Sequence, residues 1–274
     1  MHAVRLAYDG RGYHGYQRQP DVPTVEGELF DALRALGVLE GSADRPPGYS
    51  AAGRTDAGVS ALAQTVALEG PEWLTPRALN AELPPEIRAW AAATVPSTFH
   101  ATHDASRRRY VYHLYAPQSE IDDELVCEAI ERLSGRLAVD NLTRASDPRP
   151  RSVTATVERD GPFLQVTVAA GGFPWEFVRR LVAVVRAVGT GDRDPRFVDR
   201  VLDPTPLSGQ EALGPAPPGP LVLAGVSYDG VSFSRDPTAV ESASTVFDRR
   251  RVEHLTNGRV AGHIDAGITG DDSL

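Results

Sequence analysis

Residues Gly53 to Val59 place an acid and a base in a short segment framed by glycines. Arg54 and Asp56 stand two positions apart, and glycine permits backbone angles closed to other residues and lets a ligand come close. A carboxylate displayed on such a turn beside an arginine is a candidate catalytic group. For one motif of this length a solvated turn with a local ion pair is the more common case, so the remaining chain must decide.

Three further segments could meet this turn in a cleft. They are residues 99–112, residues 173–181 and residues 216–219. Taken alone, Arg179 at the centre of the second segment would be an arginine at the edge of a packed helix, with its charged end in solvent. Taken alone, Tyr110 would be an ordinary half-buried strand residue. The arginines at 107–109 alternate across a strand, so only part of this cluster can face a ligand and the others are expected to be solvated.

The composition excludes several kinds of chemistry. All 28 basic residues are arginine, which excludes a Schiff base on lysine and the lysine of a Walker loop. Cys127 is the only cysteine, so neither an internal disulfide nor a cysteine-based zinc cluster can form. The histidines form no helical i, i+4 pair, and we expect no metal site.

The net charge of −9 argues against nucleic-acid binding, because such proteins usually carry a basic face. Two interpretations stay open: an enzyme that does not act on nucleic acid, or one whose arginines cluster locally on an acidic surface. An acidic, lysine-free surface suits a salt-rich cytoplasm, where charges are screened within ~3 Å at 1 M salt. Binding would then depend on shape, stacking and short-range arginine contacts.

Hydropathy indicates a cytoplasmic protein with no membrane partner. No apolar run approaches the ~20 residues needed to span a bilayer, and the N-terminus lacks the basic and apolar stretches of a signal peptide. The chain of 274 residues is long enough for one large domain or two modest halves.

Hydrophobic periodicity predicts strands alternating with helices in two similar runs. Residues 10–15 fit the spacing G-x-G-x-x-G after a strand, but Pro20 and Pro23 interrupt the helix that a dinucleotide fingerprint requires. We interpret this segment as a glycine-rich loop with an exposed aromatic pair, Tyr13 and Tyr16. Expected strands are 4–8, 64–68, 87–95, 108–115, 152–158, 164–169 and 221–228. Expected helices follow Thr24, Thr75, Asp122, Pro174 and Asp194, with one more around 246–255, a loop at 147–150 and a disordered end at 270–274.

This order predicts an α+β fold with two related halves, mixed or antiparallel sheets flanked by helices, and a central active-site cleft. Residues 1–103 would form the N-terminal half, which carries the loop around Asp56 (residues 53–59, the aspartate loop). Residues 104–230 would complete the cleft, and 231–274 would be a C-terminal extension.

Together the four segments resemble the TruA-type tRNA pseudouridine synthases. Residues 53–61 look like the catalytic loop of that family, and residues 8–10 with 15–19 are similar to its opening strand and loop. Residues 99–112 and 177–179 look like its second and third motifs. The resemblance runs from Leu6 to Tyr228 in the order of the family, which is more specific than any single motif.

Several positions depart from the pattern of bacterial members. Tyr16 stands where tryptophan is usual and Ser60 where histidine is usual, and the residues at 137–139 are Leu-Ala-Val in place of His-Asp-Phe. These changes leave the catalytic set intact and indicate an archaeal or eukaryote-like branch.

The resemblance implies a role for each site residue. Asp56 would be the catalytic carboxylate, and Arg179 would pair with it. Tyr110 would lie against the flipped uracil, and Arg54 would occupy the space that the extruded base leaves. The isomerisation imports no group and removes no electron, so neither cofactor nor metal is required. The implied substrate is the anticodon stem-loop of tRNA, around positions 38–40, bound by a homodimer.

Two other functions stay open. One is a non-catalytic RNA-binding module that uses the same halves. The other is a carboxylate-dependent nucleoside hydrolase with Asp56 as nucleophile or base. Glycosidase chemistry with two carboxylates needs a second acid, and none stands out in the matched motifs.

Overall fold

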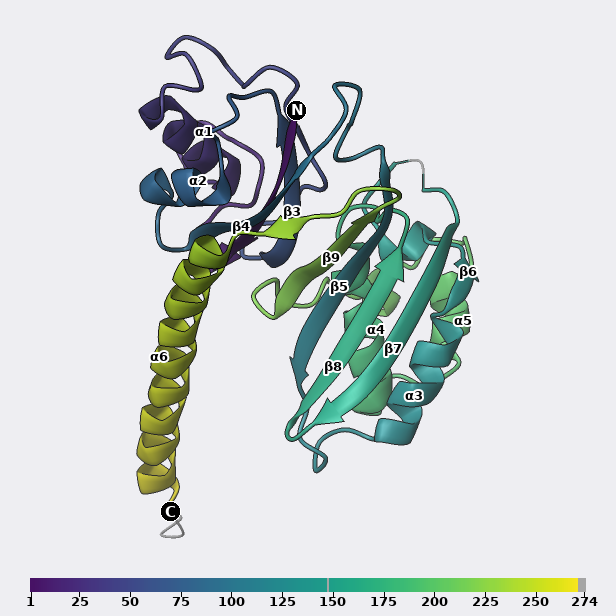
Figure 1. Cartoon of the computed structure of the whole chain (residues 1–274). Helices are drawn as coiled ribbons and strands as arrows, with labels where there is room; N and C mark the ends of the chain where they lie inside the picture. The colour runs from purple at the N-terminus through teal and green to yellow at the C-terminus, as the bar shows by residue number, and fades with distance from the viewer. Residues whose placement is uncertain (147, 271–274) are drawn as a thin grey trace.

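One mixed sheet of ten strands runs through the molecule (Figure 1). The computed structural model describes residues 1–146 and 148–270. The strands are β1 (His2–Tyr8), β2 (Ser50–Ala51), β3 (Ser60–Leu68), β4 (Ile87–Thr94), β5 (Ala105–Tyr115), β6 (Gly135–Leu137), β7 (Arg151–Asp160), β8 (Phe163–Ala170), β9 (Leu221–Tyr228) and β10 (Ser234–Arg235). Their order is β10-β4-β1-β3-β9-β5-β8-β7-β6, with β2 paired to β3. The predicted α+β class is confirmed.

The two halves of the sheet meet where β3 and β9 pair in parallel, through Ser60 with Val222 and Ala61 with Leu223. The other pairings within the described residues are antiparallel. Parallel strands need a long connection, and here that connection is residues 69–220, which include α2 and β4 as well as most of the second half. The sheet is therefore continuous although each half has its own helices.

Of the six helices described, the first three begin where the sequence predicts, the next two begin two or three residues later than predicted, and the last begins nine residues earlier. They are α1 (Val25–Ala35), α2 (Pro76–Glu82), α3 (Asp123–Arg132), α4 (Phe177–Gly189), α5 (Phe197–Leu202) and α6 (Pro237–Thr269), with 3₁₀ turns η1 (Gly10–Gly12), η2 (Asp140–Leu142) and η3 (Gly209–Glu211). Thr24, Thr75 and Asp122 accept hydrogen bonds from backbone N–H groups of the first turns of α1, α2 and α3. These bonds satisfy donors that a helix start leaves open.

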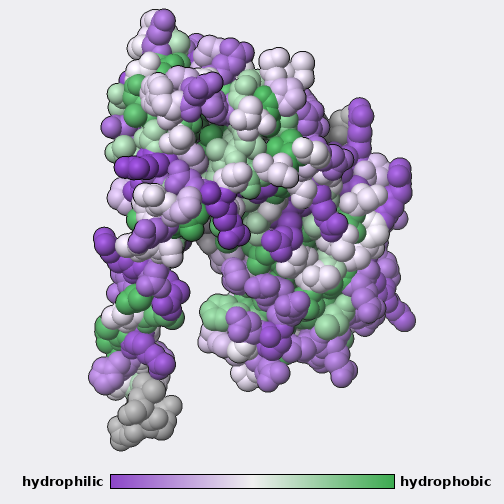
Figure 2. All heavy atoms as spheres, in the orientation of Figure 1, coloured by the Kyte–Doolittle hydropathy of each residue, from purple (hydrophilic) through white to green (hydrophobic). Residues whose placement is uncertain are grey.

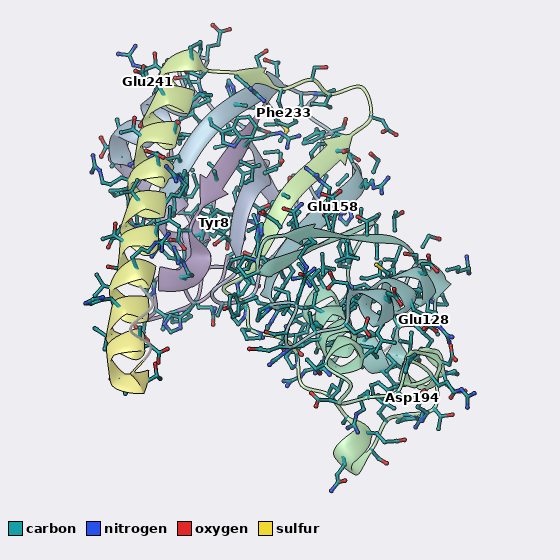
Figure 3. The ribbon with its side chains drawn as sticks, turned by 90° about the horizontal axis from the view of Figure 1, so that it is seen from below. Tyr8, Glu128, Glu158, Asp194, Phe233 and Glu241 are labelled. Atoms are coloured by element: carbon teal, nitrogen blue, oxygen red, sulfur yellow. The ribbon has the colours of Figure 1, made fainter. Side chains whose placement is uncertain are left out.

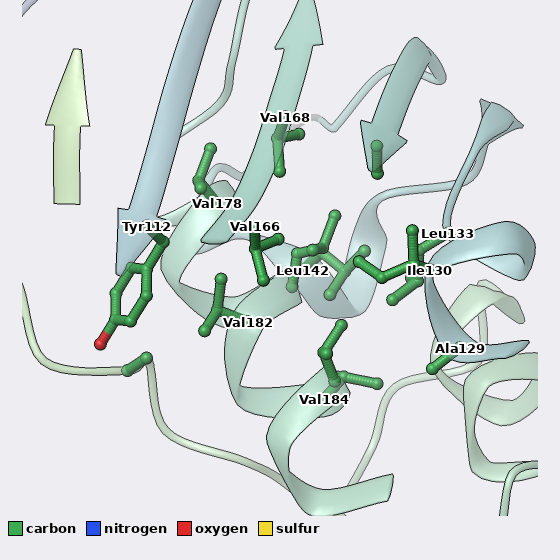
Figure 4. Packing of buried hydrophobic residues seen from close by; sticks show 14 of the residues in the cluster. Tyr112, Ala129, Ile130, Leu133, Leu142, Val166, Val168, Val178, Val182 and Val184 are labelled. Atoms are coloured by element: carbon green, nitrogen blue, oxygen red, sulfur yellow. The ribbon is translucent and has the colours of Figure 1, made fainter. Parts of the chain in front are cut away.

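Each half buries its own hydrophobic cluster under its helices. In the second half the valines of α4 pack against those of β8, beside Tyr112 of β5 (Figure 4). Burying one such side chain contributes about 1.5–3 kcal/mol. Tyr110 packs against both clusters, and Figure 3 shows Tyr8 in the first half, with Glu128 and Asp194 in the second. The division at 103/104 and 230/231 stays a prediction.

The prediction of an exposed aromatic pair at Tyr13 and Tyr16 is wrong. Their exposed fractions are 9 % and 1 %. The glycine-rich loop folds back against the aspartate loop, where the Tyr16 N–H donates to the Thr55 carbonyl at 3.0 Å. The Tyr16 hydroxyl also lies 2.6 Å from that of Tyr49. Both rings therefore belong to the core of the first half.

Helix α6 is far longer than the 246–255 segment that the sequence predicts. Only Ala239 and Ala243 are buried in it, and it projects from the first half, separate from the second half (Figures 1 and 2). The large apolar residues exposed along it are Val252, Leu255, Val260, Ile264 and Ile268. A helix without a continuous buried face has only a weak hydrophobic periodicity in its sequence. The sequence pattern therefore predicted only part of α6. Asp147 and residues 271–274, parts of the predicted loop and disordered end, lie outside the described residues.

Among the described helices, none combines the length and apolar character that crossing a bilayer requires.

A charged network connects α6 to the first loop of the chain. The buried Asp9 carboxylate accepts hydrogen bonds from Arg11 at 2.6 and 2.8 Å and from Arg250 of α6 at 2.9 Å. Arg250 also pairs with Glu86, which precedes β4. Burial alone would raise the pKa of Asp9, but the hydrogen bonds from Arg11 and the charges of Arg11 and Arg250 lower it overall.

Replacing Asp9 with asparagine should lower the free energy of unfolding by about 1–2 kcal/mol near pH 7, because two arginines lose a buried acceptor charge. The folded-state pKa of Asp9 is lowered, so its contribution is present above the unfolded pKa and disappears as pH falls through the folded pKa. The difference in stability between the two proteins, measured by urea titration, should therefore begin to shrink below about pH 4 and vanish only below the lowered pKa of Asp9. Asp31→Asn, on the surface of α1, is the control, and a difference that does not change with pH would contradict the prediction.

Candidate active site

The aspartate loop lies between β2 and β3 and is fixed by its backbone. The Gln64 side chain donates to the Gly53 carbonyl at 2.7 Å, and the Gly58 N–H donates to the Tyr13 carbonyl at 3.2 Å. Gly58 has a φ of +80° and Gly15, facing the loop, a φ of +99°. A side chain at either position would strain a backbone conformation that glycine adopts freely. The loop thus presents Asp56 from a defined conformation.

Two contacts hold the loop against the start of the chain. The Thr55 hydroxyl lies 2.8 Å from the hydroxyl of buried Tyr8. Ser60, which departs from the bacterial pattern, accepts a hydrogen bond from the Gly10 N–H at 3.1 Å. A Cβ built at Gly10 would lie 2.0 Å from the Val59 carbonyl oxygen, so only glycine permits this approach.

The Asp56 carboxylate meets the first turn of α4. Arg179 donates from Nη1 to Oδ2 of Asp56 at 3.1 Å. Their side chains are 13 % and 26 % exposed, respectively. Arg179 is therefore not simply a long side chain at the edge of a packed helix, because its guanidinium faces the predicted acid. The contact between Asp56 and Arg179, which the sequence predicts to pair, thus connects the first half of the chain to the second.

Arg179 also fixes the segment that leads into β9. Its Nε donates to the Ala216 carbonyl at 2.7 Å, and the Ala216 N–H donates to the Arg179 carbonyl at 3.0 Å. Pro218, two residues further on, lies against Gly58 of the aspartate loop. One arginine thus connects α4, the aspartate loop and the approach to β9.

Tyr110 supplies an aromatic wall beside the acid. It lies on β5 with its ring 5.2 Å from that of Phe173 in an edge-to-face arrangement of 82°. The pKa of Tyr110 is raised to about 12, chiefly by burial, while the charge of Arg108 opposes the shift and that of Asp56 adds to it. The phenol is therefore protonated at neutral pH and can donate a hydrogen bond.

Arg54, Asp56, Tyr110 and Arg179 all line one cavity of about 1700 Å³. Arg54 is exposed, and within the described residues no ion pair joins it to Asp56, whose carboxylate pairs with Arg179. The cavity is large enough for a ligand of more than one ring system. The structure brings the four predicted residues together, and their individual roles stay predictions. In the part of the chain that the structure describes, no cluster of three or more His, Cys, Asp or Glu is arranged to hold a metal ion.

The expectation that part of the 107–109 cluster faces a ligand and the rest is solvated misses Arg108. This side chain is buried and donates to three backbone carbonyls, at Ala52 (2.9 and 2.7 Å), Thr102 (2.7 Å) and Gly171 (2.6 Å). Arg107 and Arg109 are exposed. Burial lowers the pKa of Arg108, while the nearby tyrosines oppose the shift. One guanidinium thus connects three segments by hydrogen bonds to their carbonyl groups. Strand alternation alone predicted only which residues lie on the same face of the strand as Arg108.

Replacing Arg108 with lysine should cost about 2–3 kcal/mol of unfolding free energy, because one ammonium cannot reach three carbonyls that are buried away from water. Arg109→Lys, at the next position on the exposed face, should stay within about 0.5 kcal/mol of the wild type. Urea denaturation measures both variants. Equal stability of the two would show that the bonds of Arg108 contribute little.

Comparison with known proteins settles the family. A family model described as tRNA pseudouridine synthase matches residues 140–229. The tRNA pseudouridine synthase A of Natronomonas pharaonis is 54 % identical over 262 residues, covering 96 % of this chain and 98 % of that protein. The chain belongs to the tRNA pseudouridine synthase family. The resemblance inferred from the motifs is confirmed.

Two further members of the tRNA pseudouridine synthase family show the range of similarity. The synthase A of Halobacterium salinarum is 53 % identical, over 96 % of this chain and 97 % of that protein. That of Methanosarcina acetivorans is 38 % identical, over 94 % and 96 %. These organisms are archaea, in agreement with the predicted branch. Among solved structures, an archaeal box H/ACA sRNP complex matches 66 % of this chain and 45 % of that chain, at 17 % identity and a TM-score of 0.35.

Proposed function

We propose that this protein isomerises uridine to pseudouridine in tRNA and that Asp56 carries the reaction. The observation that carries the proposal is the contact between Asp56 and Arg179 at 3.1 Å, in a cavity that Tyr110 also lines. A guanidinium at this distance orients the carboxylate through a charge-assisted hydrogen bond. The family membership of nearly the whole chain supports the same activity.

The reaction rearranges one nucleoside without adding or removing atoms overall. The bond from C1′ to N1 of uracil breaks, the base turns, and a bond from C1′ to C5 forms. The proton of C5 is lost and N1 gains one. Asp56 can assist either by adding covalently to the nucleoside or by moving a proton of the ribose. In both routes its ionised oxygen is the reactive atom.

The target uridine must leave its helix before Asp56 can reach it, and extrusion costs a few kcal/mol of lost stacking. We assign Arg54, which is exposed on the cavity wall, to the space that the base vacates. Tyr110 lies against the extruded uracil, held in place by Phe173. Its protonated hydroxyl supplies a hydrogen-bond donor for the base or the ribose.

The substrate region that fits this proposal is the anticodon stem-loop of tRNA, around positions 38–40. We also propose that the enzyme acts in the cytoplasm as a homodimer, so that one tRNA contacts both subunits. These finer assignments rest on the family resemblance. The open cavity agrees with a folded RNA as the ligand, since it is wider than one nucleoside needs.

The test uses unmodified tRNA transcripts and mapping of pseudouridine after incubation with the wild-type enzyme. Transcripts in which only one of the positions 38, 39 and 40 is a uridine identify the position that is modified. Conversion at these positions supports the proposal. Binding without conversion would instead indicate an RNA-binding module, and release of free uracil would indicate a nucleoside hydrolase.

A further inference from the structure

Trp175 is an exposed aromatic residue on the wall of the cavity that contains Asp56. Trp175 is 57 % exposed. It lies between Phe173 and the start of α4 and lines the cavity. The proposed reaction assigns it no role. Large aromatic side chains bury well in protein cores, so an exposed one that lines a cavity is available to a ligand.

The backbone around Trp175 is held in an unfavourable conformation. Glu176, the next residue, has a φ of +63°, which non-glycine residues rarely adopt. Its side chain pairs with Arg144 at 3.0 Å and with Arg180 at 2.9 Å. The hydroxyl of Thr143 donates to the Trp175 carbonyl at 2.8 Å. Such strain persists only where the surroundings fix it, and it collects at binding sites.

Arg144 provides a positive charge beside the ring. Its guanidinium carbon lies 5.9 Å from the ring centroid of Trp175, and Arg144 is itself exposed. The residue Trp175 remains more than half exposed despite this contact. A flat ring next to an arginine is the combination that receives a nucleobase and its phosphate in proteins that bind single-stranded nucleic acid.

We propose that Trp175 stacks on an unpaired nucleobase that neighbours the extruded uridine, and that Arg144 contacts the adjoining phosphate. This inference rests on the proposed function, because it takes RNA as the ligand of the cavity. It adds a second base-binding position to the one formed at Asp56 and Tyr110. Because every base presents a flat face, the contact would add affinity with little sequence preference.

The chain contains a matched control in Trp73. It is 52 % exposed, close to the value for Trp175, but does not line the cavity. Replacing each tryptophan with alanine removes a similar exposed ring. Trp175→Phe keeps a flat ring and covers the case in which the alanine variant fails to fold.

The experiment measures Kd for an unmodified anticodon stem-loop RNA and the turnover of full-length tRNA. Trp175→Ala should weaken binding about tenfold or more, which corresponds to the loss of one stacked base. Its turnover at saturating tRNA should change much less, whereas Trp175→Phe should bind nearly as the wild type and Trp73→Ala should bind as the wild type. In the variant Trp73→Phe/Trp90→Phe, Trp175 is the only tryptophan left, so the tryptophan emission comes from it alone, and RNA should quench this emission.

Wild-type affinity of Trp175→Ala, or an equal loss in Trp73→Ala, would overturn the inference. The proposed function would still stand if the wild-type enzyme converted uridine in the same tRNA. A wild-type protein that neither bound nor modified RNA would overturn both. Size-exclusion chromatography of each variant completes the test, because a change in assembly at Trp175→Ala without loss of RNA affinity would mean that the ring contacts protein.

Discussion

Replacing Asp56 with asparagine should reduce the isomerisation of uridine by at least about 10³-fold, as expected when the reacting group itself is removed. The amide neither adds to the nucleoside nor accepts a proton as the carboxylate does. Its size is nearly unchanged, and the loop is held by hydrogen bonds from the Gln64 side chain and from the Gly58 N–H. We therefore expect the variant to fold and to bind tRNA with an affinity close to that of the wild type.

Asp44→Asn provides the matched control for this loss. Asp44 lines the same cavity, but its side chain is 96 % exposed and pairs with Arg18 at 3.5 Å. Single-turnover measurements of pseudouridine formation should show wild-type rates for this variant. If Asp56→Asn still converted uridine at a comparable rate, another group would carry the reaction and the proposed site would be wrong.

Replacing Arg179 with alanine should lower turnover by about 10³-fold, equivalent to ~4 kcal/mol, because the carboxylate loses the group that orients it. The folding cost should be smaller, about 1–2 kcal/mol, for the lost bond to the Ala216 carbonyl and a partly exposed ion pair. Rate measurements at saturating tRNA and urea denaturation of the same variant give the two numbers.

Arg186→Ala is the control for Arg179 because it removes an exposed arginine from the last turn of the same helix. We expect it to change neither turnover nor stability appreciably. Equal free-energy losses in rate and in folding for Arg179→Ala would mean that this residue is structural and that its contact with Asp56 is incidental to the reaction.

The sequence predicted the acid, its partner and the aromatic wall because the motifs of the family carry them in order along the chain. Strand and helix periodicity also located the elements that bring these residues together. Asp56 precedes β3, Tyr110 lies within β5 and Arg179 within the first turn of α4. Capping residues such as Thr24 showed the helix starts through local chemistry alone.

The features that the sequence did not show depend on contacts between distant segments. Arg108 reads as one member of a charge run, and only the packing of three loops around it reveals a buried guanidinium. Trp175 stands beside a strained residue that no local pattern indicates. Tyr16 was predicted to be exposed because its loop is rich in glycine, but backbone bonds to the aspartate loop bury it.

The short parallel pairing of β3 with β9 bears on how the enzyme acquires activity during synthesis. Ser60 and Ala61, just after the aspartate loop, pair with strand residues that the ribosome adds near the end of the chain. Joining such distant segments carries a large loop-closure cost and slows folding. A nascent polypeptide can therefore form much of its first half early, but the proposed site around Asp56 is completed only after translation has passed β9.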